Sequence, residues 1–98
     1  MDISEAREKF KLLRKDAWRI QVTQHAWKEH PNRRFSPAEI RDLIMYAIGG
    51  VHVNNRPSAQ PGSFLFICSD SNRKRCDLAF HFRPIGGNEF IVVVSAYR

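Results

Sequence analysis

Histidine, tyrosine and arginine are the residues of this chain that suit proton transfer and charge stabilisation without a metal ion. Four histidines stand at positions 25, 30, 52 and 81, and Tyr97 and Arg98 adjoin in a β-branched stretch. Cleavage of RNA by its own 2′-hydroxyl needs a base that removes a proton, an acid that protonates the leaving oxygen, and cations that stabilise the phosphorane. Histidine, tyrosine and arginine can supply these functions, so the composition permits this chemistry.

A metal site receives less support from the same residues. His25 and His30 are five residues apart, and on a helix this spacing turns the two side chains by about 140° from each other. They would therefore not form the two-histidine face that binds zinc. The two cysteines, Cys68 and Cys76, are too few for a thiolate framework. We expect no metal and no other cofactor.

A β-hairpin around Gly86-Gly87 is predicted to gather polar side chains on one face of a sheet. Its arms are 76–83 and 90–98, and burial of alternate residues favours pairing of Phe82 with Val92 and of Phe80 with Val94. The face predicted as core holds Leu78, Phe80, Phe82, Phe90, Val92, Val94 and Ala96. The opposite face holds Asp77, His81, Arg83, Ser95 and Tyr97. This register predicts a titratable polar cluster on one side of the sheet.

The first half of the chain predicts helices that would position this hairpin. Asp2 with Glu5, and Ser36-Pro37-Ala38-Glu39, are helix-start signals of the capping-box type. The expected elements are a helix from Asp2 whose apolar stripe reaches Ala17, a strand over 18–22, a brief helix from Thr23 to His30, and a helix from Ser36 that Gly49-Gly50 ends.

The second half predicts strands. A short edge strand over 51–53 is followed by a loop over 54–62, whose length marks it for function or mobility, and by strands over 63–68, 76–83 and 90–98. Because helices come first and strands last, we predict an α+β fold in a single domain, 1–98. Its N-terminal helices would pack on one face of a 3–4-stranded antiparallel sheet, a meander, and leave the other face for a partner.

The charge of the chain favours an anionic partner. Sixteen Lys and Arg stand against ten acidic residues, which gives a net charge of +6. Such an excess attracts nucleic acid or an acidic protein. No apolar run is long enough to span a membrane and no secretory signal is visible, so we expect no membrane association and a cytoplasmic location with reduced cysteines.

The segment from Val22 to Pro31, followed by a short helix and a meander that ends in Val94-Ser95-Ala96-Tyr97-Arg98, resembles the small nuclease domains grouped with barnase, EndoU, colicin and RelE. The phage-borne and BrnT-like branches are the most similar, because in them a histidine-bearing helix precedes a sheet whose last strand carries Ser or Thr. The resemblance covers most of residues 18 to 98.

This resemblance implies a metal-independent ribonuclease, often the toxin of a toxin–antitoxin pair or a phage-associated effector. It assigns His25 and His30 to acid–base catalysis, places Ser95 near the phosphate, and makes Tyr97 a stacking or proton-relay group. We add His81 as a catalytic candidate because of its place in the hairpin.

Two other functions remain open for the same residues. The arginines with a candidate role in phosphate contact are Arg33, Arg34, Arg83 and Arg98. They would equally serve a non-catalytic module that binds RNA or DNA, with aromatic side chains stacking on bases. A small basic adaptor that docks an acidic protein, such as an antitoxin or inhibitor, is the third hypothesis. Salt-sensitive binding without cleavage would distinguish the binding module from the enzyme.

Overall fold

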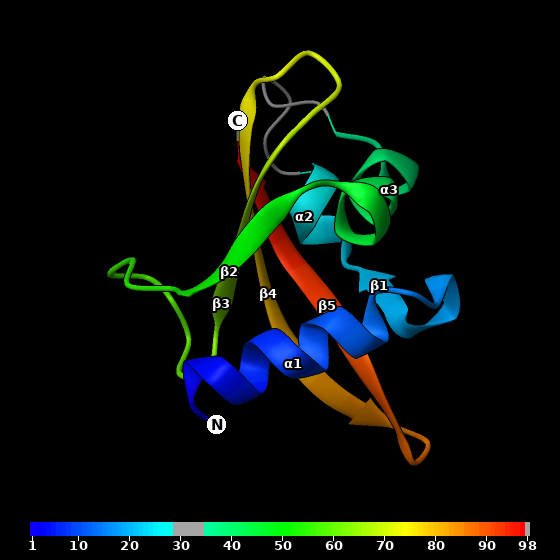
Figure 1. Cartoon of the computed structure of the whole chain (residues 1–98), viewed down its shortest axis with the longest axis vertical. Helices are drawn as coiled ribbons and strands as arrows, with labels where there is room; N and C mark the ends of the chain where they lie inside the picture. Colours follow the sequence, from blue (N-terminus) through cyan, green and yellow to red (C-terminus); the bar gives the residue numbers. More distant parts are fainter. Residues whose placement is uncertain (29–34, 98) are drawn as a thin grey trace.

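The fold is α+β, and a curved five-stranded sheet is its centre (Figure 1). The computed structural model describes residues 1–28 and 35–97. Its elements are α1 (Ile3–Leu13), the 3-10 helix η1 (Ala17–Arg19), β1 (Ile20–Val22), α2 (Gln24–Lys28), α3 (Pro37–Tyr46), β2 (Gly49–Val53), β3 (Phe64–Ser69), β4 (Arg75–Ile85) and β5 (Asn88–Tyr97).

The strand order is β1-β5-β4-β3-β2, and β2 to β5 form the antiparallel meander that the sequence predicts. The prediction of a 3–4-stranded, wholly antiparallel sheet is wrong, because β1 joins as a fifth strand and runs parallel to β5. Ile20 pairs with Ile91, far along the chain, so no local turn signal identifies this partner.

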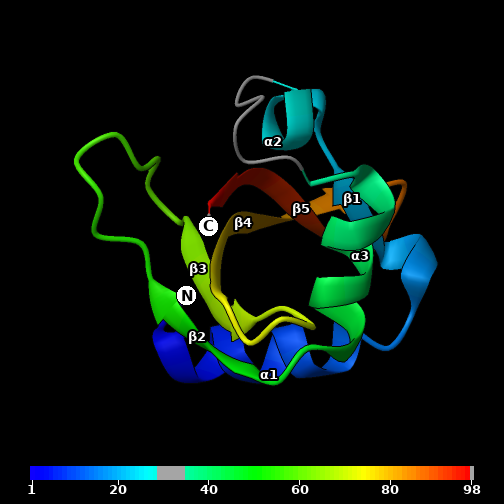
Figure 2. The same ribbon diagram turned by 90° about the horizontal axis from the view of Figure 1, so that it is seen from above.

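Helices α1 and α3 lie on the concave side of the sheet, where Figure 2 shows them closing the core. Phe10 of α1 packs its ring against Phe66 and Phe80, with centroids 4.7 and 5.1 Å apart. Ile40 and Ile44 of α3 are fully buried in the same core. The first and third helices therefore cover one face, as predicted, while α2 lies outside this curve beside β5 (Figure 2).

The helix starts follow the sequence signals, but two helix ends differ from them. The Ser36 hydroxyl accepts from the Glu39 amide and the Glu39 carboxylate accepts from the Ser36 amide, which completes the predicted capping box. Helix α1 ends at Leu13, so Ala17 belongs to η1 and not to its stripe. Gly49 starts β2 instead of ending a helix, because its pairing with Cys68 continues the ladder. None of the helices in the described ranges is long and apolar enough to cross a bilayer.

The β4–β5 hairpin differs from the predicted register by one residue near its turn. Gly86 and Gly87 both have positive φ and join Ile85 to its partner Asn88 in a tight turn. This turn pairs Phe82 with Ile91 and Phe80 with Val93, in place of the predicted Val92 and Val94. The core consequently takes Ile91 and Val93, and the predicted core residues Phe90, Val92 and Val94 lie outside the core cluster.

Candidate functional site

A cleft of about 310 Å³ lies between α2, the segment that joins β2 to β3, and the face of the sheet opposite α1. Four of the predicted catalytic residues line it: His25, His81, Ser95 and Tyr97. They come from α2, β4 and β5. The other lining residues are Asn54, Arg56, Ser58, Ala59, Gln60, Ser63, Ala79 and Val94. Three of the five residues of the predicted polar cluster, His81, Ser95 and Tyr97, therefore line the cleft, together with residues of a helix and a loop.

A β-bulge in β5 turns Ser95 and Tyr97 toward the cleft. Phe80 pairs with Val93 and the preceding residue, Ala79, pairs with Ser95, so Val94 has no partner on β4. The extra residue reverses the alternation of β5 beyond it. An unbroken strand would place Ser95 on the same face as Val93, which is in the core, whereas the bulge puts Ser95 on the face of His81.

Thr23 fixes α2 to β5 next to this bulge. Its amide and its hydroxyl both donate to the carbonyl oxygen of Val93, each at 3.1 Å. The amide of Ala26 then donates to the carbonyl of Thr23, and the buried Ala26 packs α2 onto the core. This anchoring places His25, which is exposed, at the wall of the cleft.

Arg56 is a site residue that the sequence interpretation missed. It lies in the segment between β2 and β3, and its guanidinium carbon is 3.9 Å from the centre of the Tyr97 ring. Its amide donates to Oδ1 of Asn54, whose Nδ2 donates to Oγ of Ser63, so both ends of the segment are tied together. The available signal was its charge, since no other charged residue occurs in the predicted loop 54–62.

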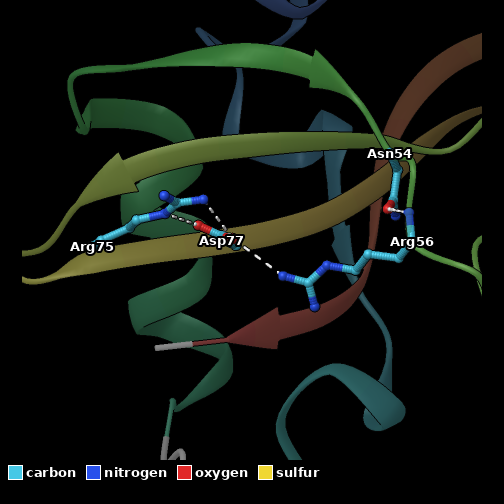
Figure 3. A network of polar contacts seen from close by, with 4 residues as sticks. All are labelled: Asn54, Arg56, Arg75 and Asp77. Atoms are coloured by element: carbon cyan, nitrogen blue, oxygen red, sulfur yellow. Dashed lines mark hydrogen bonds and ion pairs between the residues drawn. The ribbon is translucent and has the colours of Figure 1, made fainter.

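Asp77 connects Arg56 to the sheet (Figure 3). Its Oδ2 accepts from Nη2 of Arg56 at 3.2 Å, and its two oxygens accept from Nε and Nη2 of Arg75 at 2.9 and 3.2 Å. The hydrogen bond from Arg75 is the main cause that lowers the pKa of Asp77, and Arg56 adds to it against the opposing effect of burial. One ionised carboxylate is therefore shared by two guanidinium groups.

His81 is half-buried in β4, and its environment disfavours the charged imidazolium. Burial is the larger cause of its lowered pKa, and the positive charge of Arg83, two residues along the same face, is the second. A neutral imidazole at neutral pH can accept a proton, which suits a general base.

Of the remaining predicted site residues, only Arg83 lies in the described ranges, and it does not line the cleft. Arg83 is exposed on the face of β4 that carries His81, beyond the cleft lining. The other predictions, His30, Arg33, Arg34 and Arg98, fall outside the described residues. The described residues contain no group of three or more His, Cys, Asp and Glu side chains that could hold a metal ion.

Comparison with known proteins gives no match to a family model, to a curated protein or to a solved structure. The resemblance to small nuclease domains consequently stays a prediction, and the chemistry of the cleft is argued from its own residues.

Proposed function

We propose that the cleft binds single-stranded RNA and cleaves it by metal-independent transesterification. The observation that carries the proposal is the convergence of His25, His81, Tyr97 and Arg56 on one cleft from four separate segments of the chain. The reaction requires a group that takes one proton, a group that gives one proton, and positive charge beside the phosphorane. Two imidazoles, a phenol and a guanidinium meet these requirements.

The reaction forms a bond between the 2′-oxygen and phosphorus and breaks the bond between phosphorus and the 5′-oxygen. The base takes the proton of the 2′-hydroxyl, and the acid gives a proton to the leaving 5′-oxygen. The products are a 2′,3′-cyclic phosphate and a 5′-hydroxyl, and no water, metal ion or redox partner is consumed.

We assign the base to His81, because a lowered pKa keeps its imidazole neutral at neutral pH. His25, which lines the cleft from α2, is the proposed acid. Arg56 supplies positive charge to the phosphorane, and the hydroxyl groups of Ser95 and Tyr97 are hydrogen-bonding groups for the phosphate oxygens.

The charges around the cleft favour a polyanion. The described lining residues include Arg56 and two histidines but no Asp or Glu. The neighbouring Asp77 is ion-paired with two arginines, which leaves one positive charge over the three groups. The net charge of +6 adds a long-range attraction for nucleic acid.

The test is incubation of the purified protein with a labelled RNA 12-mer in EDTA, read on a denaturing gel. His25→Ala and His81→Ala should each slow cleavage by about 100-fold or more, as expected for loss of a general acid or base. His52→Ala is the matched control, because His52 is exposed on β2 and does not line the cleft. The products should carry a 2′,3′-cyclic phosphate, and an all-deoxy 12-mer should stay intact.

Two results would overturn the enzymatic proposal. Equal cleavage by the parent, His25→Ala and His81→Ala would show that the activity comes from elsewhere. RNA that stays intact but shifts on a native gel would assign the cleft to binding without catalysis.

A further inference from the structure

We infer that the substrate is a strand of about eight nucleotides that crosses the cleft along the outer face of β4, with Arg75 and Arg83 contacting phosphates on its two sides. This inference rests on the proposed function and specifies the length of the ligand and the direction in which it lies.

The alternation of β4 places its polar residues in one row. Cys76, Leu78 and Phe80 point into the core. The intervening residues, Arg75, Asp77, Ala79, His81 and Arg83, therefore share the opposite face. Ala79 and His81 line the cleft at the middle of this row, and an arginine stands at each end.

The length of the row sets the size of the ligand. Arg75 and Arg83 are eight residues apart, which is roughly 26 Å along a strand at about 3.3 Å per residue. At the stacked spacing of about 3.4 Å per nucleotide this span covers about eight nucleotides, and an unstacked strand covers it with fewer. The cleft itself, at about 310 Å³, is at the lower end of ligand-site volumes and suits only the reacting unit. Nucleotides on either side must be contacted outside it.

Both arginines are accessible for such contacts. The side chain of Arg75 is 70% exposed, and its Nη1 donates to no acceptor among the described residues although Nε and Nη2 bind Asp77. Arg83 is exposed, and no carboxylate in the described ranges pairs with it. Exposed guanidinium groups at the ends of a cleft are suited to phosphate contacts that position a strand.

The experiment measures binding of non-cleavable 2′-O-methyl oligonucleotides of 2, 4, 8 and 12 nucleotides by fluorescence anisotropy. We expect affinity to rise with length up to about eight nucleotides and then to level off. Arg83→Gln and Arg75→Gln should each weaken binding of the 12-mer roughly three- to tenfold, and each should lower the slope of log Kd against log salt by about 0.7, without weakening binding of the dinucleotide. Lys11→Gln and Lys15→Gln are charge-matched controls, because these lysines lie around a different hollow beside α3.

Equal affinity for the dinucleotide and the 12-mer would overturn the inference, as would unchanged 12-mer binding by both arginine variants. Arg75 also binds Asp77, so a merely structural role would weaken binding of the dinucleotide and the 12-mer alike. Length-dependent binding combined with no cleavage of an unmodified 12-mer would overturn the enzymatic proposal and leave this inference standing.

Discussion

The guanidinium carbon of Arg56 lies 3.9 Å from the centre of the Tyr97 ring, and the same guanidinium is ion-paired with Asp77. A cation that stacks on one residue and bonds to another is held in both position and orientation. Through these contacts, the segment between β2 and β3, which lines one side of the cleft, is attached to β4 and β5, which line another.

Arg56→Ala should loosen this wall with little effect on the whole fold. The ring stacking and the ion pair that it removes are partly exposed to solvent, so we expect the free energy of unfolding to fall by only about 0.5–1 kcal/mol. Hydrogen exchange of the amides of Ala59 and Ser63, which bond within the segment, should become faster while the amides of β4 stay protected. Lys15→Ala is the control, because Lys15 lines a different hollow and not the cleft. Unchanged exchange in the segment would show that Arg56 does not hold it.

Asp77→Asn should remove a stabilisation that depends on pH. Because the folded pKa of Asp77 lies below its ordinary value of 3.8, the ionised carboxylate stabilises the fold above that value, and this contribution is lost as the pH falls through the folded pKa. The variant should be less stable than the parent by about 1 kcal/mol at pH 6. The difference should shrink at pH 3 and below, as measured by urea unfolding.

Arg75→Gln provides the internal check on that result. The hydrogen bond from Arg75 is the main cause of the lowered pKa, so its loss should reduce the pH dependence without abolishing it, since Arg56 still pairs with Asp77. If the parent and the Asp77→Asn variant lost stability in parallel from pH 6 to pH 3, this pH dependence could not be assigned to Asp77.

Local signals in the sequence were sufficient for the helix starts, the order of the meander and the polar face. Ser36 with Glu39 forms a capping box because its partners are three residues apart, and His81 shares a face with Ser95 and Tyr97 as the hairpin pattern predicts. These features depend on neighbours in the chain or on one hairpin, whose period is visible in the residue types.

Features that depend on distant partners could not be predicted in the same way. Pairing of Ile20 with Ile91 and the approach of Arg56 to Tyr97 each bring together segments that no periodicity connects. The bulge at Val94 could not be predicted, because a run of valines is compatible with either register. The correct polar face was predicted from a register that is wrong near the turn, because the bulge restores the expected pairing beyond Ala79.

A pair of isosteric substitutions distinguishes the two registers. Val93 is fully buried in the core, so Val93→Thr places a hydroxyl among apolar side chains and should lower the free energy of unfolding by about 1–3 kcal/mol. Val94 is half-buried at the cleft, and Val94→Thr should change that free energy by about 0.5 kcal/mol or less. Urea unfolding at pH 7 measures both. If Val94→Thr lowered the free energy of unfolding more than Val93→Thr, the result would support the register without the bulge.

The titration of His81 tests the environment that its proposed role as base requires. Its folded pKa is lowered from 6.5 by burial first and by Arg83 second, so its imidazole resonances should titrate in NMR with a midpoint below 6.5. Because the unfolded chain binds this proton more readily, the contribution of His81 to stability is largest above pH 6.5 and is lost as the pH falls toward the folded pKa.

Arg83→Gln should raise the midpoint of the His81 titration but keep it below 6.5, since burial remains. His81→Gln assigns the resonances. A midpoint at or above 6.5 in the parent would remove the reason for making His81 the base.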